Sequence, residues 1–329
     1  MKNIPSYADL LRRQDAPPGS SWHVYGDNDQ LGMLNNVTPA AARRAASLVR
    51  TGETFDLDYP VNRFVPSLSG TRGTAVHHIF ANNAHHRDDW LDSFFLQSSS
   101  QIDGLRHFRH PVHGFYGGVV DQEVAEGTPH LGIQAASERA VVSRAVLVDL
   151  PAYFAAAGVE YDVATNHAVS ADDLDNATRH QEVAVEPGDI LLLYTGWAEH
   201  YLSLSEQERE RSRGTCPGLM QSHAVLEWLW DHRIGLIAAD NISVEAYPVH
   251  PDSAFFLPEE QPPVTGADHR GLMHRPLLAL LGLMLGELWR LEPLARACRV
   301  DGVYELMVSV KPLNLVGGVG SPANAIAVR

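Results

Sequence analysis

A short polar segment that follows an aromatic run holds residue types that could do chemistry. Gln97, Gln101 and Asp103 are spaced by four and then two residues, and His107 follows after Gly104. If the segment is an extended strand, these side chains point to one face, because side chains alternate along a strand. Burying two carboxamides, a carboxylate and an imidazole together is costly unless they bind something. The spacing therefore predicts a binding or catalytic site.

A second candidate set lies in the C-terminal quarter of the chain. His274 precedes an apolar stretch, and Glu287 follows within that stretch. We expect a helix over 277–291, interrupted at Gly282 and Gly286. A lone histidine near a helix start is more often a cap or a surface group, and a lone glutamate can occupy an exposed helix position. On spacing alone, a site and these structural explanations are equally supported.

Two further groups are weaker candidates. The first follows an apolar strand pattern, where α/β proteins often place sites, and comprises Asp240, Asn241, Ser243 and Glu245. An ordinary polar loop explains this group better from spacing alone. The second group contains the adjacent histidines at 77–78 and 85–86. Adjacent side chains point in different directions along a strand, so a solvated or gating loop is favoured over a complete ligand set.

These residues must be positioned by a mixed set of elements. Thr38 followed by Pro39 is a typical helix start. Helices are expected at 7–14, 40–50, 152–157, 206–213, 223–232 and 277–291. Strands are expected at 55–59, 75–80, 94–102, 144–149, 190–194, 234–240 and 303–310. The alternation predicts one mixed α/β domain spanning 1–329, with residues 1–50 as an N-terminal approach segment.

The composition excludes several classes of protein. With 329 residues, 45% of them hydrophobic and 20% charged, the chain is typical of a globular protein with a large core. Its net charge of −15 argues against nucleic-acid binding, which needs a basic surface. The N-terminus lacks a signal-peptide core, the longest apolar run is too short to span a bilayer, and only two cysteines are present. We therefore expect a cytoplasmic protein with no nucleic-acid or membrane partner.

Ordered motifs occur through most of the chain, at 26–39, 100–108, 115–118, 143–149, 188–197, 239–245, 274, 286–288 and 318–324. Together these motifs resemble the putative cyclase superfamily, which includes bacterial kynurenine formamidase and isatin hydrolase, and within it a longer branch. The resemblance implies a swivelling β/β/α-type fold, a mixed sheet with flanking helices, a homodimer or homotetramer, and metal-dependent hydrolysis of an amide or lactone.

Carried over by position, the resemblance assigns roles to individual residues. Asp103 falls on a metal-binding aspartate, His107 on a catalytic histidine, and Gln97 and Gln101 on two ligand histidines of the short branch. The implied ligand set is Gln97, Gln101, Asp103, His274 and Glu287. Because amide and carboxylate oxygens dominate this set, it favours one Mn²⁺ or Mg²⁺ ion, with Zn²⁺ as a possible alternative. The loss of two imidazoles also leaves a metal-free site as a rival.

Three hypotheses for function remain open from the sequence. The first is a hydrolase of a small amide, lactam or lactone that uses metal-activated water, with His107 as general base. The second is a metal-free lyase, dehydratase or cyclase in which His107 and Glu287 move protons. The third is a non-catalytic small-molecule binder. The expected substrate-binding residues are Arg106, Tyr116, Trp90 and Arg275.

Overall fold

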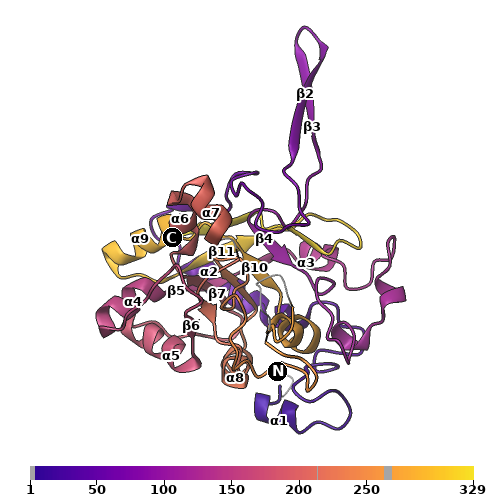
Figure 1. The fold of residues 1–329 in the computed structure, drawn as a ribbon, viewed down its shortest axis with the longest axis vertical. Helices are drawn as coiled ribbons and strands as arrows, with labels where there is room; N and C mark the ends of the chain where they lie inside the picture. The colour runs from indigo at the N-terminus through magenta and orange to yellow at the C-terminus, as the bar shows by residue number, and fades with distance from the viewer. Residues whose placement is uncertain (1–3, 213, 263–268) are drawn as a thin grey trace.

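A mixed sheet forms the centre of the computed structural model, which describes residues 4–212, 214–262 and 269–329 (Figure 1). Within these residues the sheet has nine strands in the order β1-β13-β11-β5-β7-β9-β10-β4-β12. Its strands are β1 (Thr54–Asp56), β4 (Gln101–Asp103), β5 (Val141–Asp149), β7 (Ile190–Tyr194), β9 (Leu236–Ala239), β10 (Leu285–Glu287), β11 (Glu305–Val310), β12 (Gly320–Pro322) and β13 (Ala325–Val328).

Parallel pairing is confined to the middle of this sheet. Strands β5, β7, β9 and β10 run parallel to one another, and nearly all their residues are buried. Parallel strands buried on both faces read as continuous apolar runs, which is why the sequence pattern located β5, β7 and β9. Strand β9 ends at Ala239, so the polar residues that begin at Asp240 lie at the carboxyl edge of the sheet.

Two short antiparallel strands extend the sheet beyond β10. Strand β4 pairs with β10 on one side and with β12 on the other. The register places Gln101 opposite Glu287 and Asp103 opposite Leu285. This pairing brings the polar segment near residue 100 against the C-terminal candidate, although more than 180 residues separate them in the chain.

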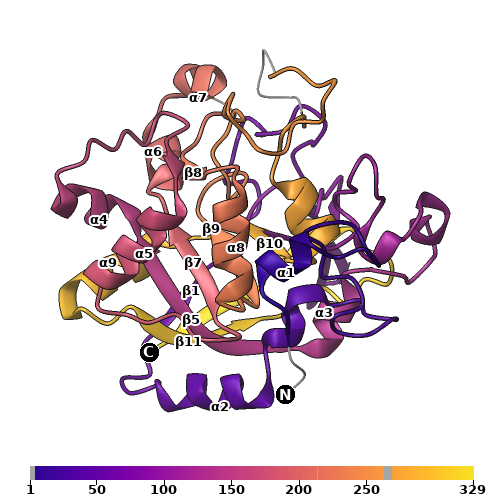
Figure 2. The same cartoon turned by 90° about the horizontal axis from the view of Figure 1, so that it is seen from below.

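Helices cover the sheet, and α2 lies on the opposite side from α4, α5 and α8 (Figure 2). Thr38 caps α2 as expected, since its hydroxyl accepts a hydrogen bond from the backbone N–H of Ala41. The α-helices are α1 (Tyr7–Leu11), α2 (Pro39–Ser47), α3 (Gln134–Arg139), α4 (Leu150–Ala157), α5 (Ala171–His180), α6 (Trp197–Ser203), α7 (Glu206–Ser212), α8 (His223–Asp231) and α9 (Glu292–Asp301). The helix predicted at 206–213 corresponds to α7, and its last residue lies outside the described residues.

Two sequence-based predictions of elements are wrong around the site. The strand expected at 94–102 is a turn followed by β4 alone. The helix expected at 277–291 is a π-helix, η4 (Arg275–Leu281), followed by strand β10. Gly282 ends η4 with φ of +67°, and a Cβ there would lie 2.6 Å from the Tyr116 ring. Glu287 therefore sits on a buried strand and not on a helix face.

The remaining elements are short or lie outside the main sheet. The pair β6 (Ala168–Val169) and β8 (Gly218–Leu219) forms a parallel ribbon. Strands β2 (Val76–Asn83) and β3 (His86–Asp92) form a hairpin that projects from the body (Figure 1). The described residues also form 3₁₀ turns at η1 (Gly32–Asn36), η2 (Tyr116–Gly118) and η3 (Asp121–Val124). None of the helices in the described part of the chain has the length and apolar character needed to cross a membrane.

Candidate functional site

Three buried ionisable side chains meet where β4 and β10 lie side by side. Asp103 comes from β4, Glu287 from the end of β10, and His274 from the turn before η4. One ligand atom from each lies within 4.8 Å of the others. Their exposed fractions are 0%, 5% and 4% respectively. Two carboxylates and an imidazole this close together, away from water, form a set that can hold a divalent cation.

The antiparallel register explains why Gln101 joins this group. Residues directly opposite each other in an antiparallel pair point to the same face, and Gln101 lies opposite Glu287. Its amide nitrogen donates a hydrogen bond to Glu287 Oε2 at 2.6 Å. The indole of Trp289 donates to the backbone carbonyl of Gln101 at 2.9 Å, which holds β4 in place.

His274 is held by a carboxylate that was only a weak candidate from the sequence. Glu245 accepts hydrogen bonds from the backbone N–H groups of Met273 and His274, and its Oε1 lies 2.5 Å from His274 Nδ1. The second ring nitrogen, Nε2, lies 3.1 Å from Glu287 Oε1. Burial lowers the pKa of His274, but the hydrogen bonds to Glu245 and Glu287 outweigh it and raise the pKa to about 10.

Gln97 lies in the turn before β4, yet it reaches the same site. Its amide nitrogen donates to Asp103 Oδ1 and to His107 Nδ1, the latter at 3.0 Å. His107 Nε2 lies 3.5 Å from Asp103 Oδ2. Burial lowers the pKa of His107, and the Asp103 charge only partly opposes this. His107 is therefore a neutral base at physiological pH, with its ring proton on the nitrogen that faces Asp103.

Two oxygens at the centre of the site lack hydrogen-bond donors. Gln101 Oε1 and Asp103 Oδ2 are both buried, and neither accepts a hydrogen bond within the described part of the chain, since His107 Nε2 makes only a longer electrostatic contact with Asp103 Oδ2 at 3.5 Å. An acceptor buried in this way costs free energy unless a ligand supplies a partner. Burial and the Asp103 charge also raise the pKa of Glu287 to about 7. A cation would satisfy both oxygens and separate the charges, so these residues fit one.

The site opens into a cavity of about 550 Å³. Arg72 lines this cavity, and its guanidinium donates to the backbone carbonyl of Gln97. The sequence alone did not single out Arg72, because one arginine in a Ser/Gly-rich loop carries no spacing signal. The other side chains that line the cavity near the site include Phe108, Ser243, Tyr247, His269, Leu272 and Leu288. A polar centre with an apolar and aromatic wall suits a small organic substrate.

Arg106, expected to bind substrate, has a structural role instead. Its guanidinium donates to the backbone carbonyls of His130, Thr128 and Gly317 at 2.5–2.7 Å, and also to the Thr128 hydroxyl. It is 6% exposed and does not line the cavity. These bonds tie the loop near residue 130 to the loop near residue 317.

Replacing Arg106 by leucine should therefore lower the stability of the fold and leave the geometry of the site unchanged. We expect the free energy of unfolding to fall by about 2–4 kcal/mol, because several buried carbonyls lose a charged donor. Urea denaturation followed by fluorescence measures this loss. Turnover per folded molecule should stay within about twofold of the wild type. A large rise in KM with unchanged stability would instead support the predicted substrate role.

The other three expected substrate residues also lie away from the cavity. Tyr116 is 1% exposed, and its hydroxyl donates to Asp29 Oδ2 at 2.9 Å. Arg275 makes a two-point ion pair with Glu260, each contact being 2.8 Å. Trp90 is 51% exposed on the β2–β3 hairpin. None of the three lines the cavity in the described chain.

A buried aspartate, Asp240, and a partly buried glutamate, Glu199, lie near the carboxyl edge of β7 and β9. Asp240 Oδ1 accepts hydrogen bonds from the backbone and hydroxyl of Thr195, both at 2.7 Å. Glu199 Oε1 accepts from the Tyr59 hydroxyl at 2.6 Å. Burial, and then the Glu199 charge, raises the pKa of Asp240 to about 7. These contacts hold the start of α6 in place, and neither acid lines the cavity.

The raised pKa of Asp240 gives a stability prediction. An aspartate titrates near 3.8 when unfolded, so the folded state holds the proton more tightly, and stability falls as pH rises from about 4 to about 7. Asp240→Asn keeps an oxygen for Thr195 and cannot ionise. The free energy of unfolding of Asp240→Asn should exceed that of the wild type by about 2–4 kcal/mol at pH 8. The two values should be equal near pH 4. Urea midpoints at both pH values test this; a pH-independent difference would contradict it.

Comparisons with known proteins add the following findings. A family model described as "Putative cyclase" matches residues 55–246. A crystal structure described as a novel cyclase matches with a TM-score of 0.80 and 30% identity, over 94% of this chain and 99% of that chain. This likeness confirms the predicted α/β fold with a mixed sheet and flanking helices. Among proteins of curated function, none matches.

Two isatin hydrolase structures share the fold at lower identity. Isatin hydrolase A from Ralstonia solanacearum matches with a TM-score of 0.55 and 15% identity, over 88% of this chain and 96% of that chain. An isatin hydrolase bound to the product analogue thioisatinate matches with a TM-score of 0.52 and 16% identity, over 88% and 95% of the two chains. At these identities the likeness concerns the fold alone.

Proposed function

This chain belongs to the putative cyclase family, and we propose that it hydrolyses a small amide, lactam or lactone with one divalent metal ion. The observation that carries the proposal is the pair of donor-free oxygens, Gln101 Oε1 and Asp103 Oδ2, beside two other ionisable groups. The isatin hydrolases of the same fold act, by name, on a cyclic amide. That likeness supports the choice of substrate class.

We assign the metal ligands to four residues, with Gln97 as a positioning group. Asp103 and Glu287 supply negative charge, Gln101 a neutral oxygen, and His274 one imidazole nitrogen. Oxygen-rich ligands favour Mn²⁺ or Mg²⁺ over Zn²⁺. When bound, such an ion would polarise the scissile carbonyl and increase the acidity of water in the site. Gln97 turns its amide nitrogen toward Asp103 and His107, so it orients both.

His107 is assigned the proton transfers. Its Nδ1 accepts a hydrogen bond from Gln97 in this structure. In the reaction, the attacking water replaces Gln97 as the donor to Nδ1. As the water oxygen bonds to the carbonyl carbon, its proton moves to Nδ1. Asp103, 3.5 Å from the other ring nitrogen, stabilises the resulting imidazolium. The proton then passes to the leaving nitrogen or oxygen as the carbon–heteroatom bond breaks.

A metal-free lyase or cyclase is the second candidate, and the protonation state of His274 favours it. With a pKa of about 10, this imidazole is protonated between Glu245 and Glu287, which neutralises part of the charge without a metal. A metal ligand must instead be neutral, so metal binding has to release this proton. The two candidates therefore differ in whether the active protein contains metal.

Metal analysis combined with an activity screen tests the proposal. We expect close to one Mn or other divalent ion per chain, and hydrolysis of at least one member of a panel of aryl amides, lactams and lactones. EDTA should remove the metal and the activity together, and Mn²⁺ should restore both. A preparation that is free of metal and fully active would overturn the hydrolase mechanism in favour of the metal-free candidate.

A further inference from the structure

Arg72 is a half-buried cation on the wall of the catalytic cavity. No other arginine or lysine of the described chain lines this cavity. Its guanidinium donates one hydrogen bond, to the backbone carbonyl of Gln97, and the described residues offer it no other acceptor. A guanidinium carries five N–H donors in a planar fork. Most of the donors of Arg72 are therefore available to a ligand in the cavity.

Other arginines near the centre of the molecule find their partners within the protein. Arg144 is 6% exposed and pairs with Asp189 at 2.9 Å. Arg275 pairs with a glutamate, and Arg106 binds several backbone carbonyls. In the described part of the chain, Arg72 makes no ion pair with a carboxylate. Removing a cation from water without a counter-charge costs free energy, so Arg72 indicates a counter-ion that comes from outside the protein.

The hydrogen bond to Gln97 holds Arg72 close to the reacting groups. The side-chain amide of Gln97 donates to Asp103 and to His107. One residue, Gln97, thus joins the cation to the proposed general base. All six residues of the loop 67–72 line the cavity. A ligand that binds Arg72 therefore occupies the same cavity as the group that reacts with His107.

The cavity also offers a flat apolar surface beside the reacting groups. The ring of Phe108 lies 5.4 Å from those of His107 and His274 and 5.0 Å from that of His269, measured between ring centroids. Phe108 and Leu272 both line the cavity. An apolar or aromatic body can pack there while a polar group at its edge meets Arg72. The walls thus suit a molecule with an apolar body and a negative charge.

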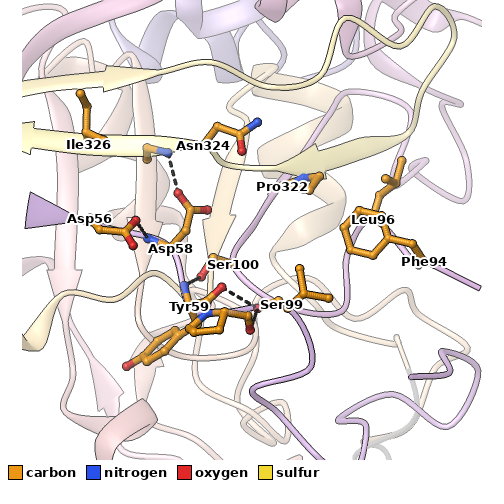
Figure 3. Close-up of a pocket in the computed structure, with 13 residues that line it drawn as sticks. Asp56, Asp58, Tyr59, Phe94, Leu96, Ser99, Ser100, Pro322, Asn324 and Ile326 are labelled. Atoms are coloured by element: carbon orange, nitrogen blue, oxygen red, sulfur yellow. Dashed lines mark hydrogen bonds between the residues drawn. The ribbon is translucent and has the colours of Figure 1, made fainter. Parts of the chain in front are cut away.

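A second cavity, lined in part by the same chain segment, carries the opposite charge (Figure 3). This groove has a volume of about 450 Å³. Ser99 and Ser100 line the groove, whereas residues 97–98 line the catalytic cavity. The charged side chains of the groove are Asp56 and Asp58, and they repel an anion at neutral pH. An anionic ligand is therefore expected in the catalytic cavity and not in the groove.

We propose that Arg72 determines substrate specificity by binding a carboxylate of the substrate. The substrate is an amide, lactam or lactone that carries a carboxylate apart from the scissile bond and rests its apolar body on Phe108. Asp103 and Glu287 balance the charge of one divalent ion, which leaves the charge of Arg72 for the substrate. The guanidinium fork matches the two oxygens of a carboxylate. The assignment rests on the proposed hydrolysis for the reacting bond and names the class of molecule that undergoes it.

Binding of simple carboxylates tests the anion site without turnover. The probes are benzoate, phenylacetate and 3-phenylpropionate, each compared with its primary amide by calorimetry on the purified protein. At least one carboxylate should bind the wild type about tenfold or more tightly than its amide, as a charge-assisted contact predicts. Arg72→Gln should abolish this preference, because glutamine keeps an N–H donor but no charge. Arg72→Lys should restore part of it, because lysine keeps the charge without the fork.

A matched control and two checks make the binding result specific. Arg63→Gln removes the same charge from an exposed position outside the cavity and should leave the preference unchanged. Circular dichroism confirms that each variant is folded, and elemental analysis confirms equal metal content. A carboxylate that binds only a metal ion would still bind to Arg72→Gln. A wild type without a preference for carboxylates, or a preference that persists in folded Arg72→Gln, would overturn the proposal.

Kinetics distinguish this proposal from the hydrolysis on which it rests. On a substrate from the activity screen that carries a carboxylate, kcat/KM of Arg72→Gln should fall by about 10–100-fold. On the neutral counterpart, in which a methyl ketone replaces the carboxylate, it should stay within about threefold of the wild type. An equal loss on both would show that Arg72 only positions Gln97, which would overturn the specificity role. If no compound is hydrolysed while carboxylates bind through Arg72, the hydrolase proposal fails and the anion site stands.

Discussion

His107→Ala is expected to lower kcat by about 10²–10⁴-fold, the usual contribution of a positioned general base. The variant should retain its metal, because we assign His107 to proton transfer and not to the ligand set. It should also fold, since the ring is held by Gln97 and Asp103 at the edge of the cavity and not within the apolar core. Turnover and metal content measured on the same preparation test both expectations.

Two further measurements sharpen this prediction. His113→Ala is a matched control, because His113 stacks on His110 at 4.6 Å outside the cavity and should leave kcat unchanged. The active form of His107 is neutral, so activity is lost as pH falls through its pKa. Because burial lowers that pKa, the acid limb of kcat/KM should lie below pH 6.5. A wild-type rate for His107→Ala would remove this residue from the mechanism.

Glu287→Gln should have the second large effect, on metal binding. The substitution preserves size and removes one of the two negative charges that we assign to the ion. We expect metal affinity to fall by about 10³-fold and turnover to fall with it, because divalent cations of this class depend on carboxylate ligands. Titration of the metal-free protein followed by calorimetry gives the affinity, and elemental analysis gives the retained metal.

The same substitution elsewhere provides the control for Glu287. Glu260→Gln changes an acid that pairs with Arg275 outside the cavity, and it should leave metal content unchanged. Excess Mn²⁺ should recover part of the Glu287→Gln activity if the defect is weak binding. Wild-type metal affinity in Glu287→Gln would show that Glu287 is not a ligand. A wild-type protein that is fully active without metal would instead indicate that Glu287 transfers protons.

Several features of the site were predictable from residue type and spacing. Asp103, His107, His274 and Glu287 were chosen from the sequence, and the structure brings them together in one place. For Asp103 and His107 the signal was physical, because polar and ionisable groups gathered on one face are costly to bury without a partner. For His274 and Glu287 spacing alone left the choice open, and the family resemblance supplied the assignment. The expected helix around Glu287 was wrong because periodicity cannot separate a short buried strand from a helix. Gly282, in its left-handed conformation, ends the helical segment early.

Other residues of the site carried no signal that local reasoning could use. Glu245 looked like one acid in a polar loop, yet its carboxylate makes two hydrogen bonds with His274 and a third with the backbone of Met273. Arg106 was expected to hold a substrate carboxylate, but its side chain points to other loops. Neighbours in sequence can face opposite ways, whereas the partners of a side chain are often distant in sequence.

The sequence by itself identified four of the ionisable residues of the site, the central apolar strands and the family. These depend on local patterns: buried parallel strands read as apolar runs, and a helix cap needs only a few adjacent residues. The tertiary structure alone decided which oxygens lack donors, which nitrogen of His107 accepts, and which arginine reaches the cavity. The reason is the register of β4 against β10, which joins residues more than 180 positions apart and is set by packing across the whole sheet.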